Sequence, residues 1–221
     1  MTSRTLHALS VVLVAVTAGC GTSATARFYT LTATATSDGA AATRAAVVVG
    51  PVSVPASVDR PQFVVQVAPN RVEIDEFNRW AAPLNDAIAQ VVANNLAVLL
   101  GTADVAAAPL AGMTPTHRVT LDVQRFETVQ GEAAVVDVVW AVRPTAGGDP
   151  RSGRTVAREP AQGKDFDALA AAHSRALAQV SRDIAAAIRA VGDSTSATPQ
   201  GRHPESDTRR RPQNPTGAGA R

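Results

Sequence analysis

The thiol of Cys20 is the side chain in this sequence with the most distinctive covalent chemistry, and it is the only cysteine among 221 residues. It directly follows Ala18 and Gly19, behind a basic start and an apolar run over residues 9–16. This order is typical of a secretory signal peptide, and the apolar run is too short to span a membrane. A cysteine directly after small residues indicates the bacterial lipobox, in which the thiol is acylated and becomes the new N-terminus. Thr17 stands where that pattern usually has leucine.

Acylation of Cys20 would have a strong physical consequence. A single acyl chain binds a membrane only marginally, whereas the two or three chains of a bacterial lipoprotein anchor it stably. Residues 1–19 would then be the signal peptide, and Gly21 in place of aspartate favours the outer membrane over retention in the inner one. Two alternatives are a plain secreted protein cut after Gly19 and a cytosolic protein with an apolar start. An unpaired thiol is a liability in an oxidising compartment, which favours acylation.

The residues that commonly carry catalysis or bind metal ions are scattered. No histidine pair or cysteine pair has the spacing of a zinc site, and neither a nucleophile elbow nor a phosphate-binding glycine loop occurs. His173 lies on the apolar stripe of a predicted helix, where a hydrogen-bonded histidine of the core is the simplest interpretation. The sequence therefore predicts a protein that is not an enzyme and that uses no cofactor and no metal ion.

Three carboxylates lie close together in one predicted strand. Glu73 and Asp75 alternate along a predicted strand and Glu76 follows them, which could suggest paired acids for proton transfer. The apolar residues Val72, Ile74 and Phe77 stand beside them. We interpret the acids as the solvent-facing side of a half-buried strand.

Two places in the sequence are better candidates for binding a partner. The stretch Asp59-Arg60-Pro61-Gln62 joins a rigid turn to groups that can form hydrogen bonds, and Trp80 stands where a strand gives way to a helix. Arginine and tryptophan are enriched among the residues that dominate interface energy. The alternatives are an ordinary turn and a tryptophan that fills the core.

The overall composition narrows the class of protein. Removal of the signal leaves roughly 200 residues, the size of one domain. The hydrophobic content of 45% suffices for a core of Val, Leu and Ala, although only 4% of residues are aromatic. The net charge of +2 comes from 21 basic and 19 acidic residues and indicates no binding of nucleic acid.

Hydrophobic periodicity predicts the elements that position these residues. Alternating or β-branched runs predict strands, and apolar residues three or four apart predict two helices. A break in alternation at Phe126 predicts a bulge, and Pro51 and Pro55 predict an edge or a bend in the first long strand. The strands are expected over 28–31, 47–55, 63–67, 71–77, 117–127, 133–144 and 154–162, and the helices over 83–100 and 165–191.

This order of elements predicts an α+β fold, a two-layer sandwich in which two main helices cover a mostly antiparallel sheet. The domain itself is expected over residues 47–191, and the strand at 28–31 is expected to join it. Residues 20–46 are otherwise too small and polar to pack, which predicts a lipidated tether. Residues 192–221 are rich in Arg and Pro, which predicts a disordered tail.

Taken in order, several segments resemble a known family. These are FYTL behind the lipidated cysteine, VVVGPVSVPASVDRPQFVV, RWAAPLNDAIAQVVANNLAVLLG, VQRFE, VVDVVWAV and ALAAAHSRALAQVSRDIAAAI. Together they cover residues 28–191 and resemble the ABC-type transport auxiliary lipoprotein family, which includes the paraquat-inducible lipoprotein C. The Arg-rich tail lies outside the resemblance.

The resemblance implies a non-enzymatic lipoprotein on the periplasmic face of the outer membrane. Such proteins work with an inner-membrane protein that carries mammalian-cell-entry (MCE) domains and forms a lipid-conducting bridge, in some systems with an ABC transporter. It also implies that Cys20 carries the anchor and is compatible with a homo-oligomer. Three alternatives remain: a periplasmic carrier of lipid or small ligands, a structural envelope lipoprotein, and a hydrolase with an unrecognised site.

Overall fold

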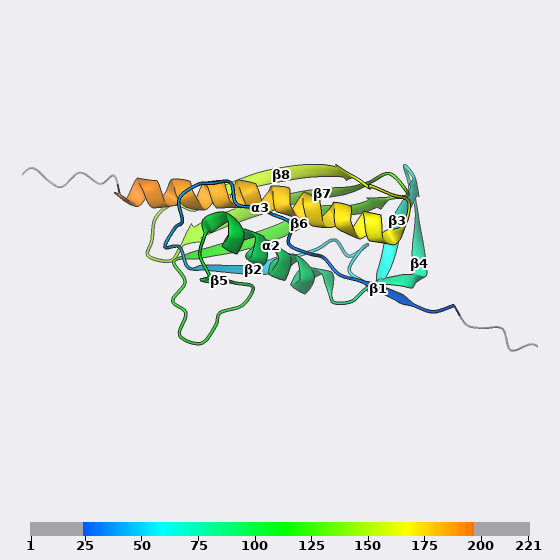
Figure 1. Ribbon diagram of the computed structural model, residues 1–221, viewed down its shortest axis with the longest axis horizontal. Coiled ribbons are helices and arrows are strands. Elements are labelled where there is room, and N and C mark those ends of the chain that lie inside the picture. The colour runs from blue at the N-terminus through cyan, green and yellow to red at the C-terminus, as the bar shows by residue number, and fades with distance from the viewer. Residues whose placement is uncertain (1–23, 197–221) are drawn as a thin grey trace, which may run out of the picture.

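The computed structural model describes the backbone of residues 24–196 (Figure 1). Within this part of the chain, one mixed sheet of eight strands is covered by two helices. The predicted α+β class is therefore confirmed. In chain order the elements are β1 Arg27–Tyr29, β2 Val47–Ser53, β3 Gln62–Ala68, β4 Arg71–Trp80, α2 Leu84–Leu100, β5 Val105–Ala106, β6 His117–Val129, β7 Ala133–Pro144, β8 Arg151–Pro160 and α3 Phe166–Ser196.

The long strand β6 organises the sheet. On one side it pairs antiparallel with β7, which pairs antiparallel with β8. On its other side, β2 runs parallel to the first part of β6, and β3 runs parallel to its last two residues. β5 flanks the start of β2, while β4 pairs antiparallel with β3 and carries β1 in parallel at its far edge. Figure 1 shows the β3–β4 hairpin standing across one end of the molecule.

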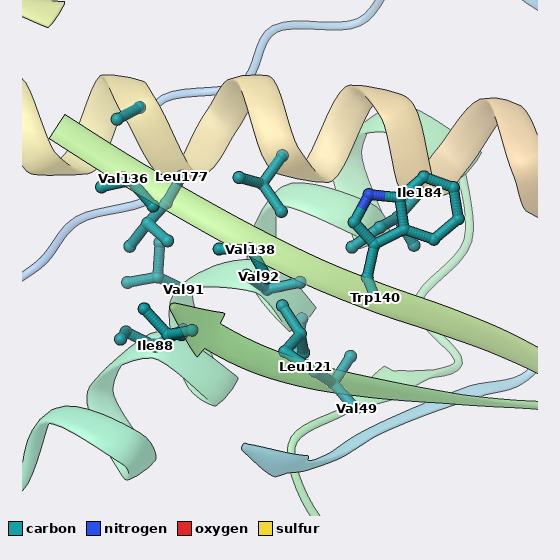
Figure 2. Close-up of a cluster of buried hydrophobic side chains, with 14 of the residues drawn as sticks. Val49, Ile88, Val91, Val92, Leu121, Val136, Val138, Trp140, Leu177 and Ile184 are labelled. Atoms are coloured by element: carbon teal, nitrogen blue, oxygen red, sulfur yellow. The ribbon is translucent and has the colours of Figure 1, made fainter. Parts of the chain in front are cut away.

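Both helices lie on the same face of the sheet and bury its core. Figure 2 shows Val91 and Val92 of α2 and Leu177 and Ile184 of α3 turned towards the side chains of β6 and β7. These helical residues are at most 3% exposed. Pro83 occupies the N-cap of α2, and Gly101 ends it with a left-handed φ of 64°, as expected from the sequence.

Two irregularities in the strands follow the sequence predictions. The register of β6 against β7 shifts between Val123 and Arg125, so the predicted bulge before Phe126 is present. The register of β2 against β6 shifts between Val49 and Val52, and only the first two residues of β2 have β5 as a neighbour. Pro51 thus lies where the pairing of β2 with β6 is irregular, and β5 does not flank β2 at this residue.

The segment from residue 30 to 46 is not a loose tether, which corrects the prediction. Figure 1 shows it in blue, crossing the helix layer before it enters β2. The amides of Thr34 and Ala35 donate to Oδ1 of Asn95 on α2 at 3.0 and 2.9 Å, and the Thr32 amide donates to Oγ of Ser174 on α3 at 3.1 Å. Small side chains let this strap, residues 30–46, lie close to both helices, and buried polar groups on the helices satisfy its backbone.

The orientation of β4 also differs from the prediction. Val72, Ile74 and Phe77 are 57%, 43% and 49% exposed. The cross-strand partners of Glu73 and Asp75 are Val65 and Phe63, which face the helices, so the acids point to the helix side and the apolar residues point away from it.

The last helix continues to Ser196, so the first five residues of the predicted disordered tail are helical. Gly192 lowers helix propensity by about 1 kcal/mol but does not break a long helix. The rest of the tail and the signal segment with Cys20 lie outside the described residues.

Candidate functional site

Four of the five candidate contact residues line one hollow. We call it the Trp80 hollow. It measures about 300 Å³ and is lined by Asp59, Arg60, Pro61, Trp80, Ala81, Ala82, Pro83 and Leu84. The sequence prediction omitted its far wall, residues 81–84, although these directly follow Trp80. The role of these residues in binding remains a prediction.

The loop from β2 to β3 presents the exposed side of the hollow. It turns tightly, because the amides of Val58 and Asp59 both donate to the Pro55 carbonyl, at 3.0 and 3.1 Å. Asp59, Arg60 and Pro61 are exposed as a result. The loop is fixed to the end of β4, where the Trp80 amide donates to the Pro61 carbonyl at 2.6 Å.

Trp80 forms the floor of the hollow and belongs to the core. It is 6% exposed and stacks on Phe63, with ring centroids 4.1 Å apart and 25° between the planes. Phe126 and His173 contact its edge, each at 5.9 Å between centroids. Trp80 therefore fills the core and offers only a small part of its surface to a ligand.

A second hollow lies beyond Trp80, where the chain leaves β1. It measures about 360 Å³, and Trp80 and Ala82 line both hollows. Its other walls come from Tyr29, Thr30 and Leu31 and from the first turns of α2. The Ala81 amide donates to the Tyr29 carbonyl at 2.9 Å, which fixes the β4–α2 junction between the two hollows.

Gln62, the fifth candidate, does not line the Trp80 hollow. It is half-buried at the start of β3, and its side-chain amide donates to Oε2 of Glu76 on β4 at 3.2 Å. Its role in the structure is to hold the two strands of the hairpin together.

The Trp80 hollow places charged groups beside apolar ones. Its charged groups are one carboxylate and one guanidinium, both exposed to solvent, and the remaining walls are aromatic, proline and aliphatic. Such a surface can form charge-assisted hydrogen bonds around an apolar centre. Among residues 24–196, no three His, Cys, Asp or Glu side chains are grouped so that they could hold a metal ion.

His173 is a core residue, as predicted, and it is fully buried. Its ring stacks on Phe126 at 4.0 Å between centroids, and Nε2 lies 2.9 Å from Oγ1 of Thr128. Burial lowers the pKa of His173 to about 3, so the ring is neutral at physiological pH.

Of the three predicted acids on β4, Asp75 binds the backbone. Oδ1 of Asp75 accepts the amides of Phe77 and Asn78 at 2.9 and 2.8 Å. Burial alone would raise the pKa of Asp75, but these hydrogen bonds outweigh it and lower the pKa. Asp75 thus stabilises the bulge of β4 as a carboxylate.

A buried carboxylate that the sequence reasoning missed lies on the open face of the sheet. The side chain of Asp137 on β7 is 2% exposed and accepts two hydrogen bonds from the Arg154 guanidinium on β8, at 2.8 and 2.6 Å. These bonds lower the pKa of Asp137. The pair joins the two strands and is a structural ion pair.

Comparison with known proteins gives both a family and a fold. The family model of the ABC-type transport auxiliary lipoprotein component matches residues 29–185. A crystal structure of a Xanthomonas campestris protein of the DUF330 family has a TM-score of 0.64 and 22% identity, covering 78% of this chain and all of that one. A second crystal structure, of an uncharacterized protein, has a TM-score of 0.62 and 22% identity, covering 75% of this chain and 99% of that one.

At this identity, the two structures establish a common fold and nothing of the activity. No curated protein sequence matches the chain significantly. No helix within residues 24–196 is both long and apolar enough to cross a membrane. The family match spans well over half of the sequence, from β1 to the middle of α3. The chain therefore belongs to the family of ABC-type transport auxiliary lipoprotein components.

Proposed function

We propose that this protein is anchored in the outer membrane through acylated Cys20, faces the periplasm, and docks an intermembrane lipid-transport bridge there. Its partner would be an inner-membrane protein with MCE domains that works with an ABC transporter. The family match carries this proposal, because it assigns the chain to the auxiliary lipoproteins of ABC-type transport. The lipobox-like sequence before Cys20 supports the anchor.

The Trp80 hollow is the docking site that we propose within this function. It combines an exposed arginine and aspartate with an apolar centre, on a loop that the backbone bond between Pro61 and Trp80 holds in place. A preformed loop loses little conformational entropy when it binds.

Capture of the MCE-domain protein by variants of the lipoprotein tests this site. Arg60→Ala should weaken capture at least tenfold, because a central arginine of an interface contributes on the order of 2 kcal/mol or more. Arg143→Ala is the matched control. Arg143 is also an exposed arginine, but it lies near the end of β7, paired with Arg118 of β6, and does not line the hollow. Equal capture by both variants would remove the hollow from the interface.

Trp80→Ala is a poor probe of binding. Truncation of a buried tryptophan costs about 3–5 kcal/mol of stability, so lost capture could reflect unfolding.

Identification of the proteins that copurify with the native lipoprotein from membranes tests the partner itself. Recovery of no transport component would contradict the proposal.

The alternative of a lipid carrier has less support. A carrier needs an apolar cavity, whereas core side chains fill the space between the sheet and both helices, including Val92, Val136 and Ile184, each 0% exposed. Stoichiometric lipid in the purified protein, detected by mass spectrometry, would favour the carrier.

A further inference from the structure

We propose that a second surface of this protein lies directly against the phospholipid membrane. This end surface consists of Phe28, Val72, Ile74 and Phe77. The inference rests on the proposed anchor at Cys20 and adds to it an orientation of the folded domain on the bilayer.

The end surface gathers large apolar side chains in solvent. Phe28 is 65% exposed, and the three residues of β4 are between 43% and 57% exposed. Tyr29 and Trp80 pair in register and are both buried under the helices, so Phe28, one residue earlier, points to the other face. Val72 and Ile74 also point to that face. An exposed apolar group of this kind marks an interaction site.

The end surface lies at one end of the molecule, and this position indicates what it contacts. The β3–β4 hairpin stands across one end of the molecule, and β1 enters at that end (Figure 1). The described part of α3 finishes at the opposite end. The 13 residues of β6 run between the two ends and span roughly 40 Å.

The segment between Cys20 and β1 is short. Phe28 follows Cys20 by eight residues, and a fully extended chain of that length reaches at most about 29 Å. Acyl chains on Cys20 would therefore hold the end surface next to the bilayer and keep its effective concentration there high. A weak apolar contact then suffices, and phenylalanine side chains favour the membrane interface.

The charges around the end surface predict the kind of contact. Arg27 directly precedes Phe28, and Arg71 and Arg79 lie on β4. Glu73 and Glu76 lie on the same strand as these two, and Arg79 pairs with Glu76 at 3.6 Å. Mixed charges give little net attraction to anionic headgroups. The contact should therefore depend on apolar burial and change little with salt concentration.

A fluorescent label on the full-length lipidated protein tests this contact. Because the native thiol is acylated, one introduced cysteine gives a single labelling site in Phe28→Cys or Ile74→Cys. Leu110→Cys is the matched control: Leu110 is 61% exposed and belongs to the β5–β6 loop at the opposite end of the molecule. The proteins are placed in vesicles of phosphatidylethanolamine and phosphatidylglycerol.

Labels at residues 28 and 74 should shift their emission to the blue, and doxyl lipids should quench them several-fold more than the label at residue 110, also at high salt. Equal, solvent-like emission at all three positions, in protein that floats with the vesicles, would overturn the inference and leave the anchor intact. Shielding that appears only with self-crosslinking or an added protein partner would also overturn it. A chain that carries no acyl group and does not float would refute the anchor and this inference together.

Discussion

Replacement of Ile184 by alanine should destabilise the fold by roughly 2–5 kcal/mol. Ile184 is 0% exposed on α3, and Figure 2 shows it on the helix side of the core together with Trp140 of β7. The loss combines the transfer free energy of the removed methyl and methylene groups with the cavity that they leave between helix and sheet. For a domain of this size, the midpoint of thermal unfolding should fall by roughly 4–20 °C.

Ile74→Ala makes the same chemical change at an exposed position. Ile74 is 43% exposed on the open side of β4, so its truncation should change the free energy of unfolding by about 0.5 kcal/mol or less. Both variants can be compared by urea unfolding, followed by circular dichroism, in a Cys20→Ser background that needs no detergent. Ile184→Ala should lower the midpoint without changing the slope.

The comparison tests the assignment of faces as well as the packing of α3. Equal losses at both sites would mean that β4 buries its apolar side after all, and a loss below about 1 kcal/mol for Ile184 would mean that α3 is not docked. Ile184→Asp should abolish the cooperative transition altogether, because it buries a charge in the apolar core.

Four further outcomes are expected. Cys20→Ser should abolish labelling with fatty acid and release the protein from membranes; retained label contradicts the lipobox. His173→Leu should flatten the loss of stability between about pH 6.5 and 3, because unfolded His173 takes up a proton that the folded ring, with its pKa at about 3, refuses; an unchanged pH slope contradicts this. Asp137 has a lowered pKa, so it stabilises the fold above about pH 4 and this contribution is lost as the pH falls further, a loss that should be absent in Asp137→Asn. Deletion of residues 197–221 should leave both folding and membrane binding unchanged, and loss of partner capture would move docking to the tail.

The elements with one clean periodicity could be predicted from the sequence. Val119, Leu121 and Val123 alternate along β6 and are all buried, and the bulge follows where the alternation fails. The stripe along α3 was equally clear, since one continuous face of this helix packs on the sheet. In these elements a single buried face determines the pattern.

β4 shows the limit of such patterns. Alternation of Glu73 and Asp75 with Val72 and Ile74 assigns them to two faces, but it cannot tell which face meets the helices when neither is fully covered. The hairpin stands at the end of the sheet, where the helix layer covers it only in part. The position of β4 in the fold, and not its hydrophobic pattern, therefore determines which of its faces points to the helices.

The strap illustrates a second limit. Its backbone amides find their acceptors at Asn95 and Ser174, about 60 and 140 residues further along the chain. Nothing local in a stretch of Ala, Thr and Ser marks such partners, because the strap forms neither helix nor strand. In the sequence, Asn95 and Ser174 look like ordinary helical residues, and only the path of the strap shows why these buried polar side chains are needed.

The candidate site lies between these cases. Asp59 and Trp80 are 21 residues apart, yet the hairpin brings them together because β3 begins at Gln62 and β4 ends at Trp80. Where an antiparallel hairpin is paired to the ends of both strands, the residue before its first strand lies beside the end of its second. Gln62 pairs with Arg79, so Pro61 lies beside Trp80 and the bond between them is that contact. The gathering of the loop and Trp80 was thus implicit in the predicted pair of strands. The departure of Gln62 was not, since its side chain binds Glu76 in a bulge that the sequence did not reveal.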